Sequence, residues 1–449
     1  MTSRRRLCAI AAVAAVALGG CTTLSRVGEV SPFHHRHRES LAAKGNRISL
    51  VDLNDQLKVA PALKGQDFFL PAPAPQAQWP VPGGTPEQSV EHIDAAPAFE
   101  IAWKRGFGAG SSRRRHVTAP PVAADGRVYV MDGGSSVSAH DERSGETIWR
   151  RNIMPKSKRD REAWGGGVAF ADGKLYASSG FREVVQLDAA SGAIGWRART
   201  EAPTHGAPTV FGGRVFVVDV NDELLAFDAA TGASDWTYQA LTEPARILAA
   251  SSPAVANDTV VASFASGELV ALRAENGNEL WNESLSRTTR TNALSEIRDI
   301  AGRPVIYKDD VYAVSHADVF AATDLRTGSA RWTLPVSAIT TPWPAGDVVF
   351  VVDQTGQVIC ASRESGQLYW IRDLNAGLKK KQRAYWSSPI LADNRLIVAS
   401  SKGEAVAINP KTGAVESRLK LGSDALIGPI AAGGMVYIAS DGGQLIAIR

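Results

Sequence analysis

Cysteine is scarce in this 449-residue chain, and none of its three cysteines has a spacing typical of a metal or redox site. No Cys-x-x-Cys pair, His-Glu-x-x-His segment, Gly-x-Ser-x-Gly elbow or phosphate-binding loop ending in Lys-Ser or Lys-Thr occurs. The sequence therefore lacks the common signatures of zinc enzymes, serine hydrolases and nucleotide-binding proteins. We interpret Cys360 as a buried substitute for alanine and not as a reactive thiol.

Histidine and excess charge are also scarce. The later histidines are His116, His140, His205 and His316, and they lack metal-ligand spacing, so structural roles are expected for them. The formal charge of +3 includes Arg4, Arg5 and Arg6. This balance gives no electrostatic reason to expect nucleic-acid binding.

No apolar run in the first part of the chain is long enough for a spanning helix, because the run from Leu7 to Leu18 is too short. It follows three arginines and precedes Gly19-Gly20-Cys21, the layout of a bacterial lipoprotein signal. We expect a signal peptide over residues 1–20 and lipidation of Cys21. Thr22 follows instead of Asp, which favours the outer membrane, facing the periplasm.

Residues 21–98 have a different composition. They contain a His/Arg cluster at residues 34–38 and a run of prolines from Pro71 to Pro86, without a repeat signature. This composition predicts a lipid-anchored, Pro-rich, flexible linker. The His/Arg cluster either binds metal or acidic headgroups or is a solvated part of this linker.

The rest of the chain repeats one unit, which is clearest where a glycine precedes a tryptophan by four positions, as in Gly277 and Trp281. Successive tryptophans of this kind are 47, 40, 45, 51 and 38 residues apart, a period typical of propeller blades. Each unit has four short apolar strand patterns separated by Gly, Asn and Asp turns. A seventh unit has Ser417 at the tryptophan position.

The eighth unit ends at Arg449 after three strands, and its missing strand matches Phe99 to Lys104, which contains Trp103. Pairing of these segments closes the ring and leaves no open sheet edge. We therefore predict an all-β fold over residues 99–449: an eight-bladed β-propeller of four-stranded antiparallel blades.

A column of tryptophans is expected to dock each outer strand against the adjacent blade. Its members are Trp103, Trp149, Trp196, Trp236, Trp281, Trp332 and Trp370. Four further tryptophans lie outside the column and are interpreted as candidates for exposed contact surfaces: Trp79, Trp164, Trp343 and Trp386. Basic residues beside aromatics at 153–164 and 378–386 either contact a protein or cover a solvated edge.

The segment Ala-Phe-Asp-Ala-Ala-Thr-Gly-Ala-Ser-Asp-Trp at Ala226 to Trp236 resembles the quinoprotein-type propeller repeat. Together with the lipoprotein signal, the repeat resembles the BamB family of the outer-membrane β-barrel assembly (BAM) machinery. The resemblance implies a scaffold without catalytic activity, cofactor or metal. It also implies binding to the POTRA region of BamA, contacts with other BAM components, and help in the insertion of unfolded outer-membrane proteins.

In that family the partner surface lies on connections in the middle of the propeller. The resemblance places it here on two segments, with Arg246, Ile247 and Leu248 in the first and Asp299 and Ile300 in the second. Apolar anchors in the centre with charges at the rim would supply affinity and orientation. The alternative is that these residues belong to turns between blades that pack on the core.

Two other functions remain open. Quinoprotein dehydrogenases share this propeller and bind pyrroloquinoline quinone with Ca²⁺, which needs oxygen ligands and, in that family, a catalytic Asp and often adjacent cysteines. This chain has no adjacent cysteines. A propeller lipoprotein that binds another envelope partner is the second alternative, because the repeats encode blade packing and not partner identity.

Overall fold

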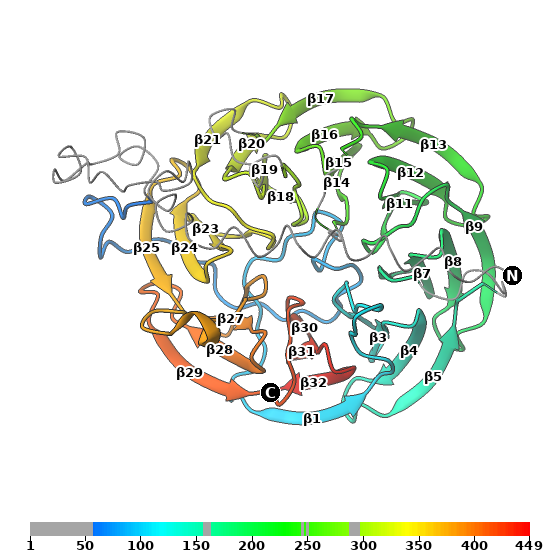
Figure 1. Ribbon diagram of the computed structural model, residues 1–449, viewed down its shortest axis with the longest axis horizontal. Coiled ribbons are helices and arrows are strands. Elements are labelled where there is room, and N and C mark those ends of the chain that lie inside the picture. The colour runs from blue at the N-terminus through cyan, green and yellow to red at the C-terminus, as the bar shows by residue number, and fades with distance from the viewer. Residues whose placement is uncertain (1–56, 156–162, 244–246, 248–250, 287–296) are drawn as a thin grey trace, which may run out of the picture. The chain divides into compact units, whose positions relative to one another are not determined.

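The computed structural model describes residues 57–155, 163–243, 247, 251–286 and 297–449. They form eight four-stranded antiparallel sheets arranged in a ring (Figure 1). The predicted all-β class and the eight-bladed propeller are thus confirmed. The predicted signal peptide, Cys21 and the first part of the predicted linker lie outside the described residues. Within the described part of the chain, no helix is long and apolar enough to cross a membrane.

Each blade runs from an innermost strand beside the ring axis to an outermost strand at the rim (Figure 1). Blade 1 comprises β2 (Val122–Ala124), β3 (Arg127–Met131), β4 (Ser136–Asp141) and β5 (Thr147–Asn152). Blade 2 comprises β6 (Gly166–Ala171), β7 (Lys174–Ser179), β8 (Glu183–Asp188) and β9 (Ile194–Arg199). Blade 3 comprises β10 (Thr209–Phe211), β11 (Arg214–Val218), β12 (Glu223–Asp228) and β13 (Ser234–Gln239). Blade 4 comprises β14 (Ala254–Ala256), β15 (Thr259–Ser263), β16 (Glu268–Arg273) and β17 (Glu279–Ser284).

The second half of the ring follows the same order. Blade 5 comprises β18 (Val305–Tyr307), β19 (Asp310–Val314), β20 (Phe320–Asp324) and β21 (Ala330–Leu334). Blade 6 comprises β22 (Trp343–Ala345), β23 (Val348–Val352), β24 (Gln357–Ser362) and β25 (Leu368–Asp373). Blade 7 comprises β26 (Ile390–Ala392), β27 (Arg395–Ala399), β28 (Glu404–Ile408) and β29 (Val415–Lys420). Blade 8 combines β30 (Ile430–Ala432), β31 (Met435–Ala439) and β32 (Gln444–Ile448) with β1 (Ile101–Gly106).

The ring closes where the sequence predicts it, since β1 pairs antiparallel with β32 and Trp103 lies opposite Ala447. The strand begins two residues later than expected, at Ile101, because Phe99 has a positive φ of 50°. Backbone hydrogen bonds in both directions between Glu100 and Arg449 extend the seam to the last residue.

The tryptophan column lies at the boundaries between blades. Six indole N–H groups donate to a backbone carbonyl of the following blade: Trp149 to Ala189, Trp196 to Ala229, Trp236 to Ala274, Trp281 to Leu325, Trp332 to Arg363 and Trp370 to Pro410. The repeat glycine of that blade lies against the indole. A Cβ on Gly328, which has φ +71°, would come within 2.7 Å of Trp281. The Gly and Trp positions of the repeat therefore belong to one contact between blades.

Residues 57–98 differ from the flexible linker that their composition predicts. The first of them lie beside the outermost strand of blade 6, where Val59 bridges Leu368 of β25. The later ones cross the centre of the ring (light blue in Figure 1) and make backbone bridges to innermost strands, such as Trp79 with Ala123 and Ile93 with Ala392. Trp79 is 1% exposed and Ile93 is fully buried. The prediction was wrong for these residues because proline-rich composition does not reveal that the inner edges of the blades can pair with the segment.

The tryptophans outside the column also differ from expectation. Trp79, Trp343 and Trp386 are buried, and Trp164 is half-buried. Trp79 belongs to the segment that crosses the ring and stacks on Trp343 of blade 6, with ring centroids 6.4 Å apart. Each of these two tryptophans therefore helps to bury the other. Cys360 is fully buried opposite Trp370, and burial raises the pKa of its thiol well above the usual value.

Candidate partner-binding site

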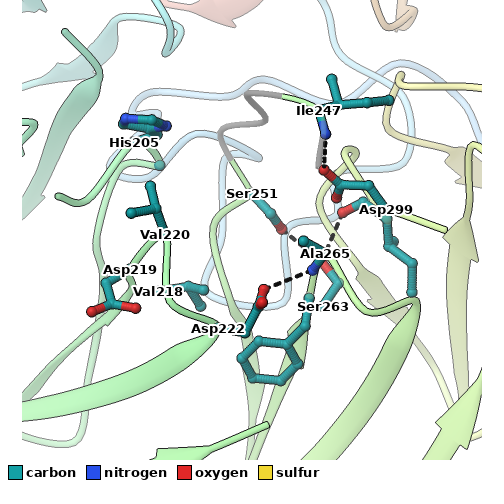
Figure 2. Close-up of a pocket in the computed structure, with 13 residues that line it drawn as sticks. His205, Val218, Asp219, Val220, Asp222, Ile247, Ser251, Ser263, Ala265 and Asp299 are labelled. Carbon is teal, nitrogen blue, oxygen red and sulfur yellow. Dashed lines mark hydrogen bonds between the residues drawn. The ribbon is translucent and has the colours of Figure 1, made fainter. Parts of the chain in front are cut away.

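A pocket opens between blades 3 and 4 and brings together residues from both segments of the predicted partner surface (Figure 2). Ile247 comes from the connection between β13 and β14, and Asp299 and Ile300 come from the connection between β17 and β18. Arg246 and Leu248 lie outside the described residues. The structure thus places three of the five predicted contact residues around one depression.

A hydrogen bond joins the two segments. The backbone N–H of Ile247 donates to Oδ2 of Asp299 over 3.0 Å (Figure 2). Asp299 is only 2% exposed and Ile300 is 1% exposed, whereas Ile247 is half-buried. Asp299 therefore holds the Ile247 connection through a buried carboxylate, and little of Asp299 or Ile300 is exposed for direct contact with a partner.

The turn between β11 and β12 contributes two more carboxylates to the pocket, Asp219 and Asp222. Asp222 accepts hydrogen bonds from the backbone N–H groups of Ala265, over 2.9 Å, and Glu243, over 3.2 Å. Asp222 thus joins this turn to the neighbouring turn of blade 4 and to the connection that leaves β13. The pocket wall is acidic and is held by bonds between blades.

Asp219 is different because one of its oxygens is buried without a partner. Its Oδ1 accepts the backbone N–H groups of Asn221 and Glu223, while Oδ2 has no hydrogen-bond partner within the described structure. Burial is the main cause that raises the pKa of Asp219 to about 6, and the neighbouring Glu223 and Asp222 add to it. The same turn in blade 1 contains Asp132, whose Oδ2 accepts the backbone N–H of Ala109 over 2.9 Å. The pocket therefore has a buried carboxylate in its wall whose charge is only partly compensated by hydrogen bonds.

His205, which lines the pocket, belongs to a cluster of three aromatic side chains. His205 stacks on Trp164 with ring centroids 4.0 Å apart, and His116 meets the same indole edge-on at 5.2 Å. These three residues come from successive connections between blades, on the same face of the ring as the pocket. Two predicted structural histidines thus flank a tryptophan that the sequence singled out as a contact candidate.

This face also displays apolar side chains. The connections from an outermost strand to the next innermost strand contain these exposed residues: Leu241, Ile339, Leu378, Tyr385 and Leu426. Leu378 and Tyr385 flank the exposed lysines 379–381 of the predicted basic segment. In the other basic segment, residues 156–162 lie outside the described residues. Exposed apolar groups beside charges are typical of a protein-binding surface.

The residues do not fit a quinone site with a bound Ca²⁺. Such an ion needs a cluster of oxygen ligands, and no group of three or more His, Cys, Asp or Glu in the described residues could hold a metal. The described cysteine, Cys360, is buried inside a blade.

Known proteins resemble this chain both in sequence and in fold. A family model described as outer membrane protein assembly factor BamB matches residues 133–372 and 376–449. The chain belongs to the BamB family. The BamB protein of Shewanella oneidensis is 26% identical over 372 residues, which cover 81% of this chain and 92% of that protein. BamB of Escherichia coli is 25% identical over 373 residues, which cover 81% of this chain and 93% of its own.

Solved structures agree on the fold. BamB from Moraxella catarrhalis superposes with a TM-score of 0.63 at 18% identity, covering 77% of this chain and 98% of its own. The quinohemoprotein alcohol dehydrogenase from Comamonas testosteroni gives a TM-score of 0.62 at 15% identity, covering 83% of this chain and 80% of its own. At these identities both structures show the propeller alone, and membership of the BamB family depends on the family match.

Proposed function

We propose that this chain is a non-enzymatic scaffold of the outer-membrane β-barrel assembly machinery, which binds the POTRA region of BamA and aids insertion of outer-membrane proteins. The observation behind the proposal is the family match, which extends over most of the ring. Anchoring by lipid at Cys21 would hold the ring at the outer membrane, on the periplasmic side.

We place the partner on the face that contains the pocket between blades 3 and 4. Ile247 at the pocket mouth supplies an apolar anchor, and the acidic wall below it gives the pocket a negative charge that favours a basic partner segment. The exposed apolar residues of the neighbouring connections extend this surface around the ring. Asp299 acts indirectly, because its buried carboxylate fixes the position of Ile247, and Ile300 packs beside it in the core between blades 4 and 5.

Binding of the purified mature protein to the purified POTRA region of BamA tests the proposal. An apolar anchor at the centre of an interface typically contributes about 2 kcal/mol or more, so Ile247→Asp should weaken binding by at least about tenfold. Leu280→Asp is the matched control, since Leu280 is exposed on the outermost strand β17 and should leave binding unchanged. Equal binding of wild type and Ile247→Asp would move the partner surface elsewhere, and absence of binding by the wild type would remove the function.

The anchor is tested separately in cells. Cys21→Ser should move the protein from the membrane fraction to the soluble periplasmic fraction, because a lipid-modified Cys21 would be the attachment point. If the Cys21→Ser protein stays in the membrane fraction, the proposed lipid anchor is wrong, whereas the POTRA binding assay is unaffected.

A further inference from the structure

The innermost strand of each blade has an unpaired edge that faces the ring axis, because the ladder continues only outward. Residues 57–98 use these edges. Four backbone N–H groups at matching positions of the innermost strands donate to this segment: Ala123 to Trp79, Phe170 to Pro80, Val255 to Pro86 and Ile306 to Glu87. Their N···O distances lie between 2.7 and 2.9 Å. The segment thus satisfies groups that the ring alone would leave unpaired.

The remaining four blades are reached by other bonds. In blade 3, Nε2 of Gln88 donates to Oγ1 of Thr209, and in blade 6, Nε1 of Trp343 donates to the carbonyl of Glu91. In blade 7, Ile93 exchanges backbone bonds with Leu391 and Asp393, and in blade 8 the N–H of Gly433 donates to the carbonyl of Gln76. One continuous segment is therefore bonded to all eight blades (Figure 1).

The packing of the segment resembles that of a core. Trp79 and Ile93 belong to the same buried apolar cluster as the inner strands of blades 7 and 8. Two of its buried polar side chains bond to the ring: Nε2 of Gln88, which is 3% exposed, also donates to the carbonyl of Pro253, while His92 is 3% exposed and links Pro71 to Asn394. A segment that buries apolar groups and bonds to the blades in this way binds like a folded ligand.

We propose that the segment of residues 57–98 contains a built-in ligand of the axial mouth of the ring, which clasps the eight blades together. The segment continues directly into β1, the strand that closes the ring. A pull on the chain from its N-terminal side therefore reaches the clasp before it reaches the pairing of β1 with β32. The bonds of the clasp to the eight blades must break before the force acts on the pairing of β1 with β32.

The clasp also assigns the two faces of the ring. It contacts the turns between the first and second strands of blades, as where Gly433 and Asp347 donate to Gln76 and Phe69. The pocket is built from turns between second and third strands, at the opposite ends of the antiparallel strands. The clasp closes one axial mouth to other ligands and leaves the pocket face for partners. This last point rests on the proposed function, whereas the clasp itself does not.

A protease cleavage site inserted between Pro97 and Ala98 in the full-length mature protein tests the clasp. Both residues are exposed, and the cut separates the clasp from β1 without removing either. With an affinity tag at the N-terminus, the cleaved protein should elute as one species that holds both fragments. In membranes that contain the lipidated protein, the ring should stay in the pellet after cleavage. Elution of the two fragments as separate species would overturn the proposal.

Two substitutions make the result specific. Trp79→Ala in the cleavable protein should release the ring from the tagged fragment, because it empties the largest buried position of the clasp. Phe69→Ala, in the same segment but 62% exposed, should leave the fragments together.

In the uncleaved protein, Trp79→Ala should also speed hydrogen exchange of the Phe170, Val255 and Ile306 amides, which a merely local cavity beside Ala123 would not do. Unchanged exchange at these three amides would contradict a clasp that acts as a unit. If the uncleaved protein is not attached to membranes, the proposed lipid anchor is wrong. The clasp is still tested in that case, because affinity purification through the N-terminal tag does not depend on lipid.

Discussion

The backbone N–H of Ile247 donates to the carboxylate of Asp299 over 3.0 Å and so joins two connections that flank blade 4. Asp299 is buried and its own backbone carbonyl accepts the N–H of His316, so it is fixed on the side of blade 5. The position of Ile247 at the pocket mouth therefore depends on a buried carboxylate of the neighbouring connection.

Asp299→Ala should free the Ile247 connection while the blades stay folded. A hydrogen bond to a charged acceptor contributes about 1.5 to 3 kcal/mol, so exchange of the Ile247 amide should rise by at least about tenfold. Affinity for the POTRA region should fall in the same variant. Hydrogen exchange measured by NMR or mass spectrometry checks the first effect, and the binding assay checks the second.

Asp258→Ala is the control for this substitution, because Asp258 lies in an exposed turn and pairs only at 3.4 Å with exposed Arg273. It should leave the Ile247 amide and partner affinity unchanged. If Asp299→Ala behaves like this control, Asp299 does not position Ile247.

Trp281 and Trp103 form a matched pair for the contact between blades. Both are 8% exposed, but the indole N–H of Trp281 donates to the carbonyl of Leu325 over 2.7 Å, while the indole N–H of Trp103 is buried without a partner. Trp281→Phe should lower the free energy of unfolding by about 1 kcal/mol or more. Trp103→Phe should lower it by about 1 kcal/mol less, since both substitutions remove the same buried ring atoms but only Trp281→Phe removes a hydrogen bond. Denaturant unfolding of both variants measures the difference, and equal losses would show that the indole bond is not the cause.

The number and order of the blades could be predicted from the sequence because of the contact between the repeat tryptophan of one blade and the repeat glycine of the next. The glycine and the tryptophan four residues later recur in each regular blade, because the glycine packs against the tryptophan of the preceding blade and the tryptophan packs against the glycine of the following one. The exception, Ser417, is also explained by the ring. A column tryptophan packs against the glycine turn between the third and fourth strands of the following blade, and in blade 8 those strands, β32 and β1, are opposite ends of the chain and share no turn.

His92 predicts a pH dependence of the clasp. Its Nδ1 lies 2.6 Å from the carbonyl of Pro71, and its Nε2 accepts the N–H of Asn394, so the bonded ring is neutral. Burial lowers the pKa of His92, while the Pro71 carbonyl and Asp393 oppose the shift. An unfolded histidine titrates near about 6.5, so the unfolded state takes up the proton first as the pH falls. Stability is therefore complete above that pH and declines below it.

His92→Gln should reduce this decline, because a glutamine can donate and accept without titrating. The melting temperature of the wild type should fall between pH 7.5 and pH 5.5 by more than that of His92→Gln. The buried His140 also has a lowered pKa and contributes equally to both proteins, so the difference isolates His92. Parallel pH profiles of the two proteins would rule out this role.

Asp219 should destabilise the folded protein at neutral pH, because burial disfavours its charged form. Its raised pKa means that the folded state binds a proton that the unfolded state releases, so stability declines as the pH rises from about 4 to about 6. Asp219→Asn should therefore raise the melting temperature at pH 7.5. Asp132→Asn, in the equivalent turn of blade 1, should lower the melting temperature, because both oxygens of Asp132 accept backbone N–H groups. Calorimetry at pH 7.5 compares the two, and destabilisation by Asp219→Asn would contradict the assignment.

Two features escaped the sequence for physical reasons. The clasp pairs through backbone edges, which impose no side-chain alternation, and Trp79 outside the column was its main visible sign. The connection at Asp299 and Ile300 contains a charged residue in a loop, which favoured an exposed position. The structure buries this carboxylate because the N–H of Ile247 supplies a hydrogen bond from the neighbouring connection. Such pairing between distant loops follows from the ring geometry and not from local composition.

The most direct test of the account is photo-crosslinking in the intact cell envelope, with a photoreactive amino acid placed at Ile247 or, separately, at Phe69. Ile247 lies at the pocket face, and Phe69 is exposed on the clasp at the opposite face. If the partner binds the pocket face, Ile247 should crosslink to the POTRA region of BamA and Phe69 should not. Crosslinking of BamA from Phe69 but not from Ile247, or of a different protein from Ile247, would contradict it.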